Sequence, residues 1–246
     1  MAALFPRGNG FPGRPGAPEE GRPRSVVLGA VCCLALTLAL LGGIIRIMAG
    51  SEALFARELA RFAPPEQTGL PEAAYPAMAA RLADYLAGRT ESVQFFLTAP
   101  DGAALPCFHD YELAHMADCR RLIRLAGLVS LTCAALAVLC AAPLFRRGRP
   151  AWRAARRGML APLRGLGAAA AVLVLWAVLN FDGLFVTFHR LAFTNDLWLL
   201  NPRTDLLIRL MPEEMFVDLG LKGLCAFAAG MALLFGPLLL RGRSGT

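Results

Sequence analysis

The stretch SVVLGAVCCLALTLALLGGIIRIM, Ser25 to Met48, decides the fold because it is apolar on every side of a helix and long enough to cross a bilayer. A membrane span needs about 20 helical residues, whereas the apolar region of a cleaved signal peptide has about 7 to 15. We therefore interpret it as a retained helix. Three further blocks of this kind follow, at residues 122–145, 167–188 and 217–240. The sequence predicts an α-helical membrane protein with four transmembrane helices.

The overall composition agrees with a membrane protein. Hydrophobic residues make up 57% of the 246 residues, above the roughly 45 to 50% of soluble domains, and the mean hydropathy is +0.52. The net charge of +7 does not indicate a nucleic-acid partner, because the arginines flank the apolar blocks and act there as orientation signals. No convincing GxSxG, SxxK or glycine-rich phosphate loop is present, which disfavours serine hydrolases and nucleotide enzymes.

The polar segments between the blocks set the orientation. We predict a disordered tail over 1–24, a small extracytoplasmic head over 49–121, a basic loop over 146–166, a second outer loop over 189–216 and a short tail over 241–246. Arginines concentrate in both tails and in the middle loop, and the positive-inside rule assigns all three to the cytoplasm. Both termini are then cytoplasmic, and the head and the second outer loop lie together outside.

The head is expected to have mixed secondary structure. Amphipathic segments run from Leu54 to Phe62 and from Ala77 to Leu86, and Ser92 to Thr98 has the character of a strand. The triplet Pro100-Asp101-Gly102 indicates a turn.

All three histidines fall near the outer surface in this topology. His109 and His115 precede the second helix, and His189 follows the third, so an antiparallel helix pair can bring His115 and His189 to the same depth. Histidines at a membrane surface often only hydrogen-bond lipid head groups. The gathering of every histidine on one side favours a shared chemical site instead.

Two carboxylates flank His115 at helical spacing. Glu112 lies one turn before it and Asp118 one turn after it, so either group is placed to fix the imidazole tautomer or raise its basicity. The alternatives are ordinary charge pairs at a helix start, or a metal site formed by His109, Glu112 and His115. The spacing of these three is not that of a zincin helix.

Asp182 lies inside the third apolar block, where an ionisable residue is a functional hypothesis because its burial in lipid costs about 2.5 to 3.5 kcal/mol. It either lines a pocket beneath His189 or pairs with Arg124 of the neighbouring helix. A small transporter that uses Asp182 as a pathway residue is a non-enzymatic alternative.

Five of the seven cysteines fall inside apolar blocks, where cysteine acts as a small hydrophobic residue. Cys107 and Cys119 lie in the polar head and would form a disulfide if paired in an oxidising compartment. They allow a second enzymatic alternative, a four-helix thiol oxidoreductase.

Two segments carry a resemblance to a known family: YELAHMAD, Tyr111 to Asp118, and FHRLAFTNDLWLLNPRTDLLIRLMPEEMF, Phe188 to Phe216. Together with the four-helix layout they resemble Lit, the bacterial lipoprotein intramolecular transacylase family. The resemblance extends over nearly the whole chain from Ser25 onward. The arginine- and proline-rich tail and the cysteine-rich helices depart from the family pattern.

The resemblance implies an enzyme of the bacterial cell membrane that acts on diacylglyceryl lipoproteins among the membrane lipids and needs no cofactor. It implies transfer of the sn-2 acyl chain to the α-amine of the N-terminal cysteine. It also implies that His115 and His189 are essential.

The residues are compatible with such a reaction. An α-amine has a reference pKa of about 7.7 to 8.0, so a nearby neutral histidine can accept its proton. Our hypothesis makes His189 the base and His115 the group that polarises or protonates the ester, although these roles can be exchanged. Asn195, Trp198 and Arg203 are candidates for positioning the glyceryl and peptide groups.

Overall fold

The computed structural model describes residues 21–98 and 102–240, and within these ranges the chain is helical apart from one short hairpin and its loops. Most of the tail predicted over 1–24, part of the turn predicted at 100–102 and the whole tail predicted over 241–246 lie outside the described residues.

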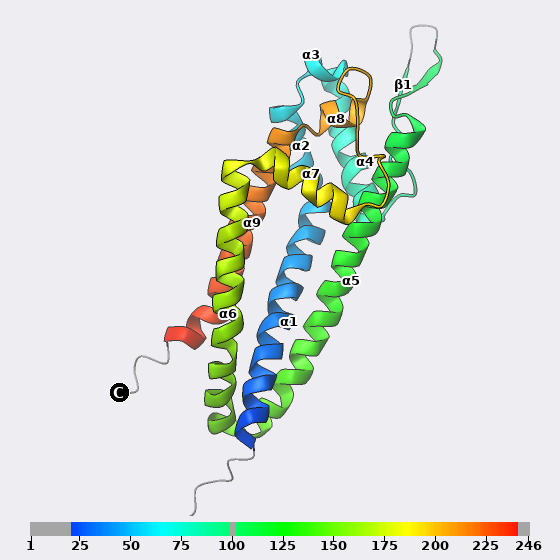
Figure 1. The fold of residues 1–246 in the computed structure, drawn as a ribbon. Coiled ribbons are helices and arrows are strands. Elements are labelled where there is room, and N and C mark those ends of the chain that lie inside the picture. Colours follow the sequence, from blue (N-terminus) through cyan, green and yellow to red (C-terminus); the bar gives the residue numbers. More distant parts are fainter. Residues whose placement is uncertain (1–20, 99–101, 241–246) are drawn as a thin grey trace, which may run out of the picture.

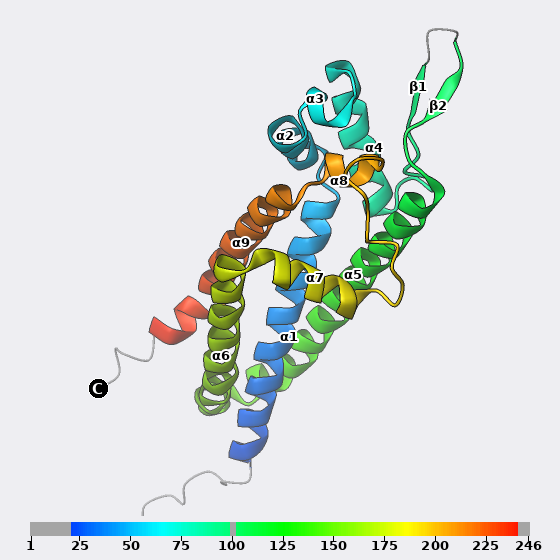
Figure 2. The same cartoon turned by 45° about the horizontal axis from the view of Figure 1, so that its top comes forward.

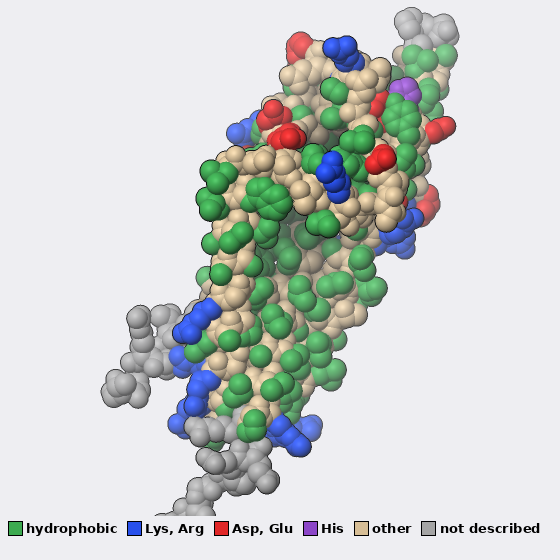
Figure 3. All heavy atoms as spheres, viewed as in Figure 1, with side chains coloured by type: hydrophobic (Ala, Val, Ile, Leu, Met, Phe, Trp, Pro, Cys, Tyr) green, Lys and Arg blue, Asp and Glu red, His purple; other side chains and the backbone are tan. Residues whose placement is uncertain are grey.

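Four helices of the described chain are long and apolar enough to cross a membrane: α1 (Gly21–Ala49), α5 (Asp110–Arg146), α6 (Gly148–Leu179) and α9 (Glu213–Leu240). They form an elongated stem, with a small head at one end (Figure 1). Large apolar side chains cover the stem surface (Figure 3), and Leu233, for example, is 79% exposed. Such a surface is stable in lipid rather than in water, so the predicted fold class is confirmed.

Close backbone contacts hold α6 against α1. A Cβ atom added to Gly29 would lie 2.0 Å from the carbonyl oxygen of Ala155, and one added to Gly158 would lie 1.9 Å from that of Val26. Small residues allow membrane helices to approach in this way, because lipid-facing helices gain little from apolar burial and depend on close packing.

The segment predicted as a basic loop over 146–166 is largely helical. The chain turns at Gly148, whose φ of 75° is accessible to glycine, and α6 begins there directly. The face of α6 that carries Ala151, Ala154 and Ala155 is buried, while Arg153 and Arg157 are exposed. The predicted loop is wrong because the charge of this segment does not decide its conformation, whereas the packing of its alanine-rich face does.

The third predicted span, 167–188, is also not continuous. Helix α6 ends at Leu179, and a separate helix, α7 (Phe181–Ala192), begins after Asn180. The Asn180 side chain accepts a hydrogen bond from the Gly183 amide at 2.8 Å, which caps the new helix. Hydropathy did not reveal this break, because the residues on both sides of Asn180 are apolar.

The head contains α2 (Glu52–Phe62), α3 (Pro65–Thr68), a 3-10 turn (Glu72–Ala74), α4 (Tyr75–Ala87) and α8 (Leu206–Leu210), with an antiparallel hairpin of β1 (Phe96–Thr98) and β2 (Ala104–Pro106). The hairpin pairs Leu97 with Leu105. The fully buried side chains of Leu59, Met78, Leu82 and Leu210 form the centre of the head core. The mixed head is therefore present, with its expected helices and strand.

Helix α5 connects the head to the stem without a break. At 1.5 Å per residue it is about 55 Å long, well beyond the roughly 30 Å of a hydrocarbon layer. The Glu112 carboxylate accepts a hydrogen bond from the His109 amide at 2.7 Å and so caps the start of the helix. Residues 110–121, which the sequence assigns to the head, thus form the first turns of the long helix that carries His115.

Candidate active site

The short helix α7 crosses in front of α1 from the end of α6 toward α5 (Figures 1 and 2). This crossing brings His189 of α7 next to His115 of α5, with ring centroids 6.1 Å apart. The two side chains are buried, with exposures of 7% for His115 and 8% for His189. The structure thus brings together the two histidines that the topology placed at one depth.

His189 has a defined tautomer. Its Nδ1 lies 2.8 Å from the Phe185 carbonyl oxygen, which can only accept a hydrogen bond, so Nδ1 carries the proton. In the neutral ring the lone pair is then on Nε2. Burial lowers the pKa of His189 below its ordinary value of 6.5, and the hydrogen bond to Phe185 opposes this shift only in part. His189 is therefore a neutral imidazole with a free basic nitrogen at pH 7.

His115 is held differently. Its Nε2 lies 3.5 Å from the Cys119 sulfur, one helical turn further along α5. Its Nδ1 is buried and has no hydrogen-bond partner among the described residues. A buried polar atom without a partner costs free energy. Such an atom beside His189 is available to a bound substrate.

Aromatic rings surround the histidine pair. Phe193 packs edge-on against His115 at 5.1 Å and lies 5.5 Å from His189. The Phe185 ring lies 4.2 Å from His189, and the Trp198 ring lies 5.1 Å from it. These rings exclude water from one side of the imidazoles, which strengthens electrostatic interactions within the site.

A hydrogen bond of 2.9 Å from the Asn195 side chain to the Asp118 carboxylate fastens the loop after α7 to α5. Beside it the loop forms a cavity of about 410 Å³, whose lining residues are Arg190, Phe193, Thr194, Asn195, Asp196, Trp198 and Leu199. Phe193 and Trp198 belong both to this cavity and to the rings around the histidines. The cavity therefore lies next to the histidine pair.

Neither predicted carboxylate forms a hydrogen bond with the His115 ring. Asp118 bonds to Asn195 and to Arg121. Glu112 is fully buried and accepts from the backbone amides of His109 and Leu207, both at 2.7 Å. Glu112 thus joins the start of α5 to α8 in the head, and its observed contacts are structural.

Two other predicted site residues lie away from the histidine pair. Asp182 is exposed in the first turn of α7, where a carboxylate interacts favourably with the helix dipole, and the described chain contains no ion pair between it and Arg124. Arg203 is exposed in the turn before α8 and does not line the cavity beside the histidines.

The described part of the structure forms neither the metal site nor the disulfide that the sequence allows. No group of three His, Cys, Asp or Glu side chains within residues 21–98 and 102–240 is placed to hold a metal ion, so His109, Glu112 and His115 do not form one. Cys107 and Cys119 are both free thiols. His109 itself is exposed and stacks on Tyr111 at 5.3 Å.

Three residues of the site were not recognised in the sequence. Phe185 and Phe193 lie four residues before and after His189, and Cys119 lies four residues after His115. This spacing places Phe185 and His189 on one face of α7, and His115 and Cys119 on one face of α5, whereas Phe193 directly follows the end of α7. The helical spacing that points to Glu112 and Asp118 is therefore also the signal for apolar and sulfur-containing neighbours of the histidines.

The fold and the site define a helical membrane protein with a buried histidine pair where its stem meets its head. Residues 30–216 match the family model described as lipoprotein intramolecular transacylase Lit. The chain belongs to this family, and it is accordingly a bacterial membrane acyltransferase.

Solved structures have the same fold. The lipoprotein intramolecular transacylase Lit of Bacillus cereus matches with a TM-score of 0.68 at 18% identity, over 89% of this chain and 97% of that one. A structure of the same enzyme with a histidine-to-arginine substitution matches with a TM-score of 0.63 at 17% identity, over 93% and 96% of the two chains. No curated protein matches this chain.

Proposed function

We propose that this chain moves the sn-2 acyl group of a diacylglyceryl lipoprotein to the α-amine of the same molecule's N-terminal cysteine, and that its two buried histidines catalyse the transfer. One observation carries the proposal. The ring centroids of His115 and His189 lie 6.1 Å apart. Nδ1 of His189 donates to the Phe185 carbonyl oxygen, so Nε2 is the basic nitrogen of this ring.

His189 acts as the general base in this reaction. Its Nε2 takes a proton from the α-amine while the amine nitrogen attacks the carbonyl carbon of the sn-2 ester. An amide C–N bond forms and the ester C–O bond breaks. The glyceryl oxygen leaves and receives the proton that His189 accepted, either directly or through His115, so the histidines return to their starting state. No electrons are transferred, and water is not consumed.

His115 polarises or protonates the ester oxygens. Its Nδ1 is buried without a partner in the described chain, so a substrate oxygen is a suitable acceptor when this nitrogen carries the proton. The alternative tautomer places the proton on Nε2, next to the Cys119 sulfur.

The substrate geometry explains why two histidines and a water-poor pocket are sufficient. Attack by the amine on its own ester closes a ring of about eight atoms, so the enzyme mainly has to hold both ends of one molecule together. The rings of Phe193 and Trp198 provide an apolar wall for the acyl and glyceryl groups. The cavity next to Trp198 is suited to the peptide that follows the cysteine.

We also propose that the active site faces the extracytoplasmic side and that both termini are cytoplasmic. The junction of α5 and α6, with Arg146, Arg147 and Arg149, lies at the end of the stem opposite the head, and α1 begins at that same end (Figure 1). The positive-inside rule places such an end in the cytoplasm.

The test replaces each histidine with alanine and examines the N-terminus of a reporter lipoprotein by mass spectrometry in cells that express the variant. We expect His115→Ala and His189→Ala to lose at least about a hundredfold in product, since general acid and base catalysis contributes roughly that much or more. Membrane expression is checked by immunoblot for each variant.

His109→Ala is the matched control. This histidine lies at the start of the helix that carries His115, and it is exposed. Its hydrogen bond to Glu112 comes from its backbone amide, which alanine keeps. We expect its activity to remain near the wild-type level. Full transfer by both pair variants would overturn the proposed roles.

A further inference from the structure

A second cavity, of about 550 Å³, lies between α1 and α5 at the level where the stem meets the head. Its lining combines two arginines, Arg46 and Arg124, with small and aliphatic residues: Gly43, Ile47, Gly127, Leu128, Ser130, Leu131 and Ala134. We name it the α1–α5 groove. The proposed reaction does not use it.

The Arg46 side chain lines the groove, and one of its donor nitrogens has no hydrogen-bond partner in the described chain. Its Nη2 donates to the Ala87 carbonyl oxygen at 2.8 Å, whereas Nη1 is buried and has no partner among the described residues. Gly127 provides the space, because a Cβ atom there would lie 3.1 Å from Cδ of Arg46. The guanidinium is thus held on one side, while its Nη1 lacks an acceptor in the described chain.

The charge in this region is not balanced. Two nearby arginines, Arg89 and Arg120, already pair with Asp84 and Glu91. Within the part of the chain that the structure describes, no ion pair or hydrogen bond engages the guanidinium of Arg124, which is exposed. The groove therefore has two positive charges that no acidic side chain of the described chain compensates.

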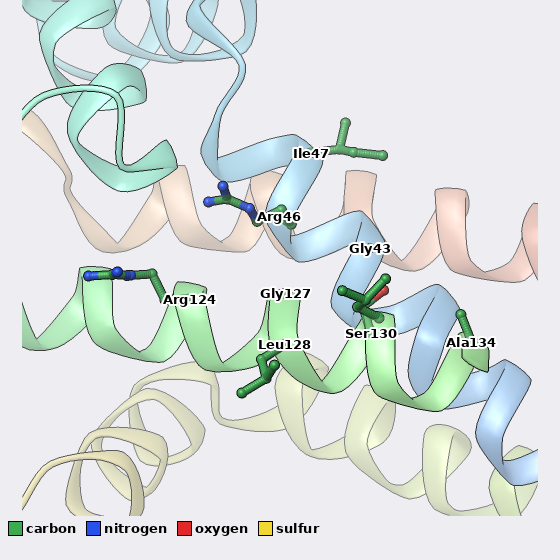
Figure 4. A pocket seen from close by; sticks show the side chains of 9 residues that line it. Gly43, Arg46, Ile47, Arg124, Gly127, Leu128, Ser130 and Ala134 are labelled. Carbon is green, nitrogen blue, oxygen red and sulfur yellow. The ribbon is translucent and has the colours of Figure 1, made fainter. Parts of the chain in front are cut away.

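The polarity of the groove changes along its length. The guanidinium groups of Arg46 and Arg124 point toward the same end, and the residues of α5 that follow Arg124 lead away from them down the stem (Figure 4). That continuation is apolar and open, since Leu131 is 70% exposed. A ligand that fits has an anionic group at one end and hydrocarbon at the other.

The groove is separate from the histidine pair. Arg124 follows His115 by nine positions, which is two and a half turns at 3.6 residues per turn, so their side chains project from opposite faces of α5. The offset along the axis is about 13 Å at 1.5 Å per residue. A ligand in the groove cannot be the reacting ester at the histidines.

We propose that the α1–α5 groove binds one anionic phospholipid of the membrane, with its phosphate between Arg46 and Arg124 and its acyl chains along Leu128 and Leu131. Guanidinium groups bind phosphate oxygens through paired, charge-assisted hydrogen bonds. Nη1 of Arg46 lacks an acceptor, and both arginines lie at the edge of the apolar stem, where lipid phosphates are found.

The experiment measures lipid retained by purified full-length protein in detergent, using native mass spectrometry. Phosphatidylglycerol, phosphatidylcholine and diacylglycerol with identical acyl chains are added separately. We expect phosphatidylglycerol to remain bound to the wild type and diacylglycerol to be lost, because it has no phosphate. Arg124→Gln should weaken phosphatidylglycerol binding about tenfold or more, as expected for the loss of a charge-assisted hydrogen bond.

Arg81→Gln is the matched control, since it removes the same charge from an exposed site on α4 that does not line the groove. We expect it to bind phosphatidylglycerol like the wild type. Equal binding by Arg124→Gln and wild type, equal retention of diacylglycerol, or displacement of the lipid by millimolar inorganic phosphate would each overturn the proposal. Because Arg124 is exposed and has no partner in the described chain, its replacement is not expected to impair folding.

Discussion

The Asn195 side chain donates a hydrogen bond of 2.9 Å to the Asp118 carboxylate, across 77 residues of sequence. Asp118 lies one turn beyond His115 on α5, and Asn195 lies six residues beyond His189 in the loop after α7. This bond therefore connects the two elements that supply the histidine pair. It fixes the loop, while the rigid helix carries His115.

Asn195→Ala should reduce catalysis more than stability. Without the bond to Asp118, α7 and its loop can shift relative to α5, and a displacement of about 1 Å at a reacting centre can cost about a hundredfold in rate. We expect kcat for a synthetic diacylated lipopeptide to fall about 10- to 100-fold. The melting temperature should change little, because the bond is exposed.

Asp118→Asn is the companion variant. Its side-chain oxygen can still accept from Asn195, while the exposed pair with Arg121 is lost at small cost. It should retain most of the activity. If Asp118→Asn loses activity while Asn195→Ala keeps it, the charge of Asp118 rather than the hydrogen bond is what matters.

Acid should destabilise the protein partly through His189. Burial lowers the pKa of this imidazole below its ordinary value of 6.5, so the folded state binds the proton less readily than the unfolded chain. The stability that its neutral form contributes is complete above about pH 6.5. It is lost as the pH falls through the lowered pKa of the folded state.

Thermal unfolding in detergent at pH 7.5 and at pH 5 tests this dependence. His189→Gln does not titrate, so its melting temperature should fall by a few degrees less than that of the wild type between the two pH values. An identical fall in both proteins would show that other groups account for the acid sensitivity.

The four spans could be predicted because a bilayer imposes a minimum length of apolar helix. The same constraint placed His115 and His189 on one side of the membrane. The helical form of residues 146–166 could not be derived from charge, since it depends on contacts such as Gly158 with Val26 that are remote in sequence. Hydropathy also missed the break at Asn180, although Asn before Asp182 and Gly183 is a helix-start signal.

The chemistry of the site was only partly visible in the sequence. Helical spacing correctly placed Glu112, His115 and Asp118 on one helix, but it could not show which partner each carboxylate would take. Glu112 bonds to Leu207, and Asp118 bonds to Asn195, and both partners come from distant segments. The tautomer of His189 likewise depends on a backbone carbonyl, which no residue pattern specifies.

Glu112→Ala should destabilise the protein without a specific effect on catalysis. It would leave the buried amides of His109 and Leu207 without their acceptor, and each unsatisfied donor costs about 1 to 3 kcal/mol. Glu112→Gln keeps one acceptor oxygen, so we expect melting temperatures in the order wild type, Gln, Ala.

Activity per folded molecule distinguishes a structural role of Glu112 from a role in orienting the His115 ring. Glu112→Gln should have nearly the wild-type kcat at a temperature where it is folded, because the His115 ring receives no hydrogen bond from Glu112. A large loss of kcat in folded Glu112→Gln would mean that the carboxylate supports the imidazole after all.

Alanine should destabilise the protein at one glycine of α6, Gly158, but not at another, Gly165. At Gly158 the new Cβ would lie 1.9 Å from the Val26 carbonyl oxygen, so α1 and α6 must separate, and overpacking of this kind costs about 1 to 3 kcal/mol. At Gly165 no atom lies within 4 Å of the new Cβ, and alanine improves helix propensity by about 1 kcal/mol. We expect Gly158→Ala to lower the melting temperature in detergent and Gly165→Ala to leave it unchanged or raise it. A Gly158→Ala protein as stable as Gly165→Ala would show that α1 and α6 do not pack at this distance in the membrane.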